Sequence, residues 1–328
     1  MTTSGVVSFS VNQQQIITDA MMNCGALGVG ETITDDDYQL CSRRLNMLVK
    51  QWQGRQDFSP GLKMWSRKNG NLFLSATTGT YSLGPNGTGW ATNFTQQSTT
   101  VAAANGATSV TLASAAGISS GDNIGVVLDS LALNWTTVNG APAGNVVTLT
   151  TGLAGTAASG NVVYTYPVAS QARRPLAIVT AVLRDQNNND VPIYTMTLQD
   201  YQALPTKTQV LAPTDPTSYY YQADLVNGTL KTDAPAAADC NKRIHFVYLS
   251  PPEDFVASTD TPDYPQEWYL ALVDGLAVNI APAFSLPVTQ DMRLSFASSL
   301  AIAQQSNAET TTLYFQKDQN DFTSWGNF

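Results

Sequence analysis

The chain has 328 residues, of which 43% are hydrophobic and only 12% are charged, and its formal net charge is −9. That length can hold two or more domains with a buried core. The acidic balance argues against a basic surface that grips nucleic acid, because such binding neutralises phosphates with Lys and Arg. The charged fraction is about half of the roughly 25% typical of soluble proteins, so uncharged polar groups must dominate the surface.

The start of the chain and its cysteines bear on location. The first residues, MTTSGVVSFSV, lack the basic region and long apolar run of a signal peptide, and no stretch approaches the ~18 apolar residues of a membrane span. Cys24, Cys41 and Cys240 are odd in number and widely spaced, so neither a disulfide framework nor a zinc site is visible. We therefore expect a protein made and folded in a cytosol, with no membrane contact.

Two helices are predicted near the start. Apolar residues recur at three- and four-residue spacing from Ile16 to Leu27, as one face of a helix requires, and glycines then end the pattern. Thr34 precedes three aspartates, a helix cap followed by acids that the helix dipole favours. A second apolar stripe runs from Tyr38 to Trp52. The pair predicts a helical hairpin.

The middle of the chain favours strands. Residues 72–74 and 81–83 bracket a Thr-Thr-Gly turn and are interpreted as a β-hairpin. From about residue 99 to 166 nearly every charge is lost, and short Val- and Thr-rich runs alternate with Gly and Asn turns, which predicts a small all-β module. Strands are also expected at 175–183 and 192–196, joined by an Asn/Asp-rich turn, and at 217–221, 229–231 and 243–249. In the last of these, Ile244, Phe246 and Tyr248 should share one face.

Helical periodicity returns late in the chain. Tyr264, Trp268, Leu272, Leu276 and Ile280 step at four residues, and prolines separate this helix from another at about residues 292–303. Residues 310–328 place many aromatic side chains among Gln, Asn and Asp, which is unusual for a terminus unless they dock on a partner.

The predicted fold class is α+β, with a discontinuous α-helical bundle of N- and C-terminal helices and a large inserted all-β region. Neither helical hairpin alone buries both of its faces, so the two should meet in space. The expected domains are a helical core with a C-terminal docking tail (residues 1–56 and 262–328), a β-rich insertion (57–98 and 167–261) and the small all-β module (99–166). The expected seam of the helical core consists of Tyr38, Leu45, Leu48, Trp52, Trp268, Leu272 and Leu276.

We find no catalytic motif in the sequence. The single histidine, His245, lies in a predicted strand without a nucleophile motif beside it, and no Walker, dinucleotide-binding or zinc-protease motif is present. Acid pairs such as Glu253/Asp254 are expected in any chain of this size and are interpreted as solvated groups. The Asn/Asp-rich turn lacks the spaced carboxylates and closing Glu of a calcium loop. We therefore predict no enzyme activity, no metal and no cofactor.

Two stretches resemble a known family. The motifs IITDAMMNCGALGVGETITDDDYQLCSRRLNMLVKQWQG near the start and YPQEWYLALVDGLAVNIAPAF near the end are similar to the head-to-tail adaptor, or tail accessory factor, of short-tailed bacteriophages. The likeness covers about residues 12–54 and 263–309. The chain differs from the simplest members of the family in its predicted β insertion of about two hundred residues.

The resemblance implies a virion protein rather than an enzyme. It implies a homo-oligomeric ring of twelve copies below the portal protein, which joins head to tail, extends the DNA channel, retains packaged DNA and passes it on at ejection without specific binding. Downstream tail, nozzle or fibre proteins would bind its lower rim. Because aromatic residues dominate such interfaces, the expected contacts to the portal or to neighbouring copies are Leu313, Tyr314, Phe315, Phe322, Trp325 and Phe328.

Two other classes stay open. Thr/Gly/Asn-rich strands with scattered Trp90 and Trp135 are also compatible with a carbohydrate-binding or adhesive tail module, which would bind glycan in isolation. A wall-degrading tail hydrolase would need activity on peptidoglycan or polysaccharide. Binding to a portal distinguishes the adaptor from both.

Overall fold

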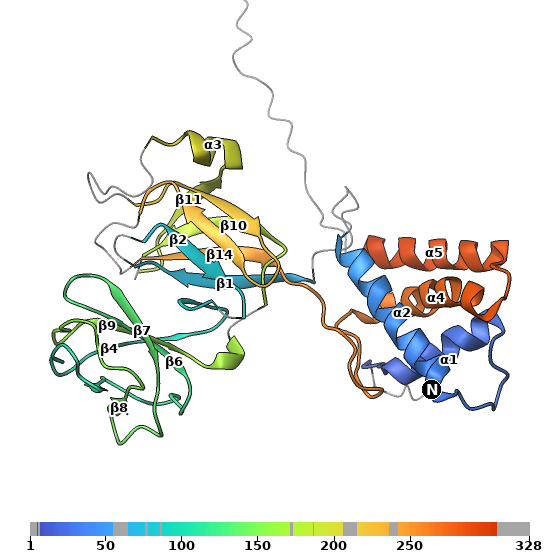
Figure 1. Ribbon diagram of the computed structural model, residues 1–328, viewed down its shortest axis with the longest axis horizontal. Coiled ribbons are helices and arrows are strands. Elements are labelled where there is room, and N and C mark those ends of the chain that lie inside the picture. Colours follow the sequence, from blue (N-terminus) through green and yellow to red (C-terminus); the bar gives the residue numbers. More distant parts are fainter. Residues whose placement is uncertain are drawn as a thin grey trace, which may run out of the picture. The chain divides into compact units, whose positions relative to one another are not determined.

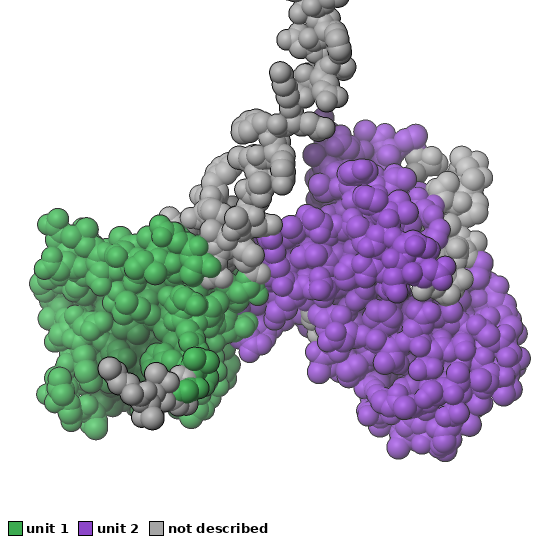
Figure 2. Space-filling model, turned by 180° about the vertical axis from the view of Figure 1, so that it is seen from behind, with its two compact units in different colours: residues 1–65, 254–328 green, residues 66–253 purple. Residues whose placement is uncertain are grey.

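A computed structural model describes residues 5, 7–54, 65–75, 78–85, 87–170, 173–185, 187–205, 215–235 and 242–306. It contains both helices and strands, which confirms the α+β class (Figure 1). The chain divides into two compact units (Figure 2). The helical unit comprises Met1–Trp65 and Asp254–Phe328, and the β unit comprises Ser66–Glu253.

Among the residues that the structure describes, the helical unit contains four α-helices and two short 3-10 helices. Helix α4 packs against α1, α2 and α5, and α1 also contacts α2. A capping box starts α1, because Asn12 accepts from the backbone of Gln15 while the Gln15 side chain accepts from Asn12. The elements are α1 (Gln13–Cys24), α2 (Asp35–Gly54), η3 (Gln266–Trp268), α4 (Tyr269–Ile280), η4 (Ala281–Phe284) and α5 (Gln290–Ser306).

The start of α2 confirms the predicted cap. The Thr34 hydroxyl accepts from the backbone N–H of Asp37 at 3.3 Å and donates to the Asp37 carboxylate at 2.6 Å. Three aspartates occupy the first turn, where the positive end of the helix dipole stabilises them.

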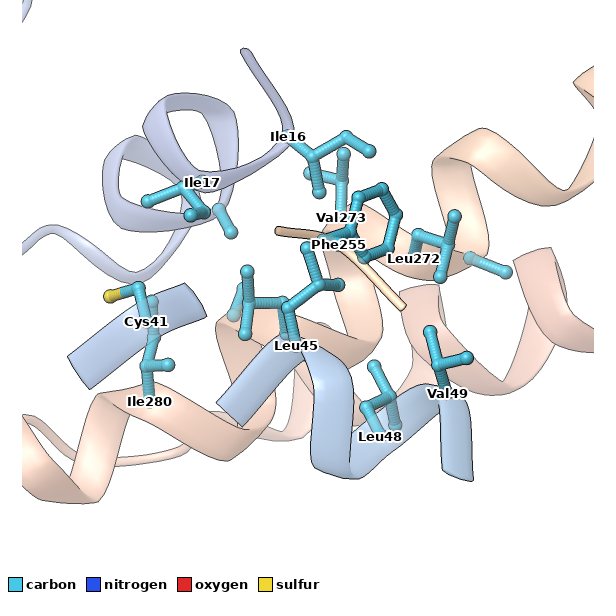
Figure 3. Close-up of a cluster of buried hydrophobic side chains, with 14 of the residues drawn as sticks. Ile16, Ile17, Cys41, Leu45, Leu48, Val49, Phe255, Leu272, Val273 and Ile280 are labelled. Atoms are coloured by element: carbon cyan, nitrogen blue, oxygen red, sulfur yellow. The ribbon is translucent and has the colours of Figure 1, made fainter. Parts of the chain in front are cut away.

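The core of the helical unit draws on both ends of the chain (Figure 3). Side chains of α1, α2 and α4 converge there, and Phe255 packs among them. The largest fully or nearly fully buried members are Ile16, Ile17, Met21, Leu45, Leu48, Trp52, Trp268, Leu272, Leu276 and Ile280.

The segment before α4 places the boundary of the units earlier than the predicted residue 262. Asn46 of α2 both donates to and accepts from the backbone of Phe255, at 2.9 Å each way. The N–H groups of Gln13 and Gln14 at the start of α1 donate to the carbonyls of Asp260 and Ser258. These bonds satisfy donors that a helix N-terminus leaves without intrahelical partners, so the segment from Asp254 onward belongs to the helical unit rather than to the predicted β insertion.

An eight-stranded sheet forms the larger part of the β unit, in the order β2-β13-β12-β11-β10-β14-β1-β3. All neighbours are antiparallel except β11 and β12. A short helix, α3 (Leu198–Ala203), follows β11. The strands are β1 (Arg67–Phe73), β2 (Thr80–Leu83), β3 (Trp90–Ala91), β10 (Ala177–Arg184), β11 (Asp190–Thr195), β12 (Ser218–Ala223), β13 (Gly228–Thr232) and β14 (Arg243–Leu249).

The sheet corrects one predicted pairing and confirms two other predictions. The β-hairpin expected at residues 72–83 is wrong, because β1 pairs with β14 and β3 whereas β2 pairs with β13. Strands β10 and β11 do form the predicted hairpin around the Asn/Asp-rich turn. Ile244, Phe246 and Tyr248 share a buried face, as their alternation requires.

The small β module, residues 95–166, packs a four-stranded sheet in the order β4-β9-β6-β7 with a two-stranded sheet of β5 and β8. It begins earlier than the predicted residue 99, since β4 pairs with β9. Although it has its own core around Ile124, Val126 and Val163, it lies in the same compact unit as the large sheet. The strands are β4 (Thr95–Ser98), β5 (Ser109–Thr111), β6 (Asn123–Val127), β7 (Leu133–Thr137), β8 (Val146–Thr148) and β9 (Val162–Tyr166), and η2 (Val168–Ser170) follows.

Phe73 joins the large sheet to the module. Leu72 and Leu74 point into the core of the large sheet, so the alternation of a strand turns Phe73 to the other face. There its ring lies 4.4 Å from that of Tyr164 and 4.9 Å from that of Phe94, between ring centroids. Tyr166 packs in the same cluster.

Substituting Phe73 tests this joint. Phe73→Ala should lower the free energy of unfolding of the β unit by about 3–5 kcal/mol, because it removes a buried ring and leaves a cavity. Chemical denaturation followed by far-UV circular dichroism measures the change. The control Val101→Ala alters an exposed side chain and should change stability by less than about 0.5 kcal/mol. Equal effects of the two substitutions would contradict the assignment.

Candidate functional site

Trp52 is the centre of the seam between the two ends of the chain. Its ring lies 5.6 Å from Trp268, 6.1 Å from Tyr264 and 6.4 Å from Phe296, between centroids. Trp65 extends the cluster, 4.8 Å from Tyr264. Offset and tilted aromatic pairs at these separations are favourable beyond the area they bury. This cluster therefore binds α2 to the segment that leads into α4 and to α5.

The predicted seam residues fall in one core, with one difference. Leu45, Leu48, Trp52, Trp268, Leu272 and Leu276 are all buried. Tyr38 is only partly buried, and its hydroxyl donates to the Gln13 side chain of α1 at 2.8 Å. The buried Gln13 in turn donates to Ser42 at 2.7 Å. Tyr38 is thus a polar link between α1 and α2 in addition to an apolar contact.

A buried carboxylate connects α4 to α5. Asp274 accepts from the hydroxyls of Ser295 at 2.8 Å and Ser299 at 3.1 Å. Its neighbour Gly275 lets the helices approach, because a Cβ there would lie 2.8 Å from Phe296 and 3.1 Å from Leu48. Periodicity in the sequence marked the apolar stripe of α5 but not this polar pair of serines. The serines could have been found only once Asp274 was known to be buried.

The outer face of α5 carries apolar side chains that the described residues do not cover. Leu294 is 59% exposed and Ile302 is 61% exposed. They lie on a helix that has no charged residue from Leu294 to Ser306. Charge is depleted at the centres of protein interfaces, so this face is a candidate assembly surface. The six expected aromatic and aliphatic contacts, Leu313, Tyr314, Phe315, Phe322, Trp325 and Phe328, lie outside the described residues.

The described residues contain no group of three His, Cys, Asp or Glu side chains that could hold a metal ion. His245 bonds to the Asn71 side chain at 3.0 Å, and burial, with Arg184 nearby, lowers its pKa. Burial, then the charge of Asp37, raises the pKa of Cys41 to about 11. A thiol with that pKa is a poor nucleophile at neutral pH.

The adjacent acids Glu253 and Asp254 are in separate ion pairs. Glu253 pairs with Arg173, and Asp254 pairs with Lys50 at 2.6 Å. In the Asn/Asp-rich turn, the side chain and backbone of Asn189 donate to Asp185 and lower its pKa. The carboxylate oxygens of Asp185 therefore accept hydrogen bonds from within the turn.

Open clefts among the described residues include the following three. One of about 480 Å³ lies between α1 and the loop before α2. Another, of about 630 Å³, follows the outer face of α2 beside Met47. The third, of about 490 Å³, lies in the β unit and is lined by Arg67, Lys68 and Arg173 among others. Sequence reasoning missed this third cleft, because its residues come from separate parts of the chain.

Comparison with models of known protein families and with curated proteins found no match for this chain. Within the described residues, no helix is both long enough and apolar enough to cross a membrane.

Truncating Trp52 tests whether the seam stabilises the helical unit more than an exposed side chain of the same helix does. Trp52→Ala should lower the free energy of unfolding of the helical unit by about 3–5 kcal/mol, since a buried ring with three aromatic neighbours is lost. Urea denaturation measures the change. Met47→Ala is the matched control on α2, because Met47 is 57% exposed and should cost less than about 0.5 kcal/mol. A Trp52→Ala protein as stable as the control would refute the seam.

Thiol labelling tests the state of Cys41. In a Cys24→Ala, Cys240→Ala protein, Cys41 should react at pH 8 at least about a hundredfold more slowly than in the same protein unfolded by guanidinium. A pKa of about 11 leaves only ~0.1% of the thiol as thiolate at that pH, and burial blocks access as well. The rate should rise with pH toward 11. Rapid, pH-independent labelling of the native protein would contradict the assignment.

Proposed function

We propose that this chain is a structural virion protein that forms a ring below a portal, joining head to tail and extending the DNA channel. The observation that carries the proposal is the single core of the helical unit. The two stretches that resemble phage adaptors, about residues 12–54 and 263–309, contribute most of that core. If the likeness had arisen by chance in two unrelated apolar helices, there would be no reason to expect the two to share one core.

We further propose that α1, α2, α4 and α5 form one discontinuous bundle into which the β region is inserted. This arrangement is supported by the contacts of α4 with the other three helices. It is also supported by the pairing of β1 with β14, in which Arg67 lies opposite Leu249. The insertion then leaves and rejoins the bundle at neighbouring points of the β unit.

The surface chemistry supports passage of DNA without tight binding. The chain carries 25 acidic against 16 basic residues. Phosphate contacts from Lys and Arg supply most of the non-specific affinity for DNA, and a net acidic protein makes few of them. In the proposed ring, the exposed apolar side chains of Leu294 and Ile302 on α5 contact a neighbouring copy or the portal. The β unit binds later tail proteins.

Incubation of the purified chain with the portal of the same virus, followed by electron microscopy, tests the proposal. We expect a ring of twelve copies attached to the portal, in line with the adaptor family. Free trimers, or a chain that ignores the portal, would refute it and favour an adhesive tail module. Release of reducing sugar from a bacterial wall preparation would instead favour a hydrolase.

The C-terminal aromatic residues provide a sharper test. Replacing Leu313, Phe315 and Trp325 with Ser in the full chain should weaken portal binding at least about tenfold, because aromatic and aliphatic anchors carry most interface energy. Surface plasmon resonance on immobilised portal measures the affinity. The matched control replaces Thr311, Gln316 and Asn320 of the same segment with Ser and should bind as the original chain does. Equal binding by both variants would exclude this segment from the interface.

A further inference from the structure

An open cleft in the β unit gathers cationic side chains. Its volume is about 490 Å³, within the range of roughly 300–1,000 Å³ common for small-molecule sites. The lining comes from the start of β1, the residues after β3, the chain beyond η2, and the end of β14 with the residues that follow it. The side chains used below are Arg67, Lys68, Asn93, Arg173, Tyr248 and Glu253.

The charge of the cleft is opposite to that of the chain. It holds three cations, Arg67, Lys68 and Arg173, and one carboxylate, Glu253, although the whole chain has a net charge of −9. Glu253 pairs with Arg173, whose other nitrogen donates to the carbonyl of Pro251 at 3.3 Å. Lys68 forms no ion pair with any residue that the structure describes. The charge of Lys68 at the cleft is therefore not neutralised by any described ion pair.

Tyr248 contributes a buried hydroxyl that lacks a hydrogen-bond partner among the described residues. Its side chain is fully buried, and its ring packs against Trp90 and Phe246 at centroid distances of 5.8 Å each. Its hydroxyl has no hydrogen-bond partner among the described residues. Leaving a buried polar group unsatisfied is unfavourable, and native proteins rarely do so without a reason. A ligand in the cleft would supply the missing partner.

The register of the strands places Tyr248 opposite a cationic residue. Lys68 of β1 lies directly opposite Tyr248 of β14, so both side chains rise from the same face of the sheet. Burial raises the pKa of Tyr248 to about 12, with the Arg173 guanidinium acting in the opposite direction. The phenol therefore stays protonated at neutral pH and can donate. Cationic N–H groups and an O–H donor meeting in one cleft match a negatively charged acceptor.

We propose that this cleft binds an anionic sugar, a saccharide bearing a carboxylate or a phosphate. The oxyanion would accept from Lys68 and the Tyr248 hydroxyl. The uncharged polar lining, including the Asn93 amide, would bond to sugar hydroxyls. Typical small-molecule sites are lined mainly by apolar groups, whereas this one is mainly polar, which suits a hydroxylated ligand. The proposal goes beyond the adaptor function and does not depend on it.

Calorimetric titration of the full chain with four probes tests the class of ligand. D-Glucuronate carries the carboxylate, glucose 6-phosphate carries the phosphate, glucose is the neutral control, and inorganic phosphate lacks the sugar. We expect saturable binding of glucuronate or glucose 6-phosphate, at least about tenfold tighter than glucose and weakened by salt. The arm that binds more tightly identifies the oxyanion. No saturable binding of either anionic sugar would overturn the proposal, and equal affinity for inorganic phosphate and glucose 6-phosphate would overturn its saccharide part.

Three variants locate the site. Lys68→Gln should weaken binding about tenfold, because a charge-assisted hydrogen bond is lost. Tyr248→Phe keeps the packed ring and removes only the hydroxyl, and it should weaken binding several-fold. Arg293→Gln, which alters an exposed cation of the helical unit, is the matched control and should leave the affinity unchanged. Binding that is the same in Lys68→Gln as in the original chain would overturn the assignment, whatever the portal experiment shows.

Discussion

The aromatic contact of Trp52 with Trp268 is the interaction on which the rest of the arrangement depends. These side chains belong to opposite ends of the sequence, and the chain between them must leave the helical unit and return. The β unit meets that constraint with its first and last strands, since β1 and β14 are antiparallel neighbours. The N–H of Ser250 also donates to the carbonyl of Ser66 at 2.8 Å. An insertion whose ends are paired in this way leaves both cores intact.

A second constraint operates within the β unit, where one strand packs on both faces. Leu72 points into the large sheet and Phe73 into the joint with the small module. The joint also buries Arg243, whose guanidinium lies 5.2 Å from the Phe94 ring and donates to Asn188 at 3.0 Å. Burial lowers the pKa of Arg243, yet arginine stays charged. A cation placed over a ring in this way fixes geometry more than it adds stability.

The sequence predicts the local features well and the distant pairings poorly. The start of α2 follows from Thr34 and the aspartates after it, and the buried face of β14 follows from simple alternation. The partner of β2 does not follow from the local sequence, because β2 pairs with β13 far along the chain. A turn signal predicts pairing only between strands that are adjacent in sequence. Asp260 falls within the predicted β-rich insertion, because nothing local shows that its carbonyl accepts from the first turn of α1.

The same limit applies to the candidate sites. The seven seam residues follow from helical periodicity, because a helix repeats its buried face every three to four residues, and all seven pack in or against one core. The cationic cleft could not, since Lys68 and Tyr248 become neighbours only through the register of β1 with β14. No periodicity in either strand distinguishes them from other residues.

Helix α5 gives the clearest reason to look for function at the surface. Met292, Phe296 and Leu300 pack on the core, while Leu294 and Ile302 face outward. A helix with apolar residues on opposite faces is normally covered on both. A solvated outer face gains nothing from Leu and Ile, whereas a packed one gains roughly 1.5–3 kcal/mol for each such side chain fully buried. In the proposed ring, a neighbouring copy or the portal would bury Leu294 and Ile302.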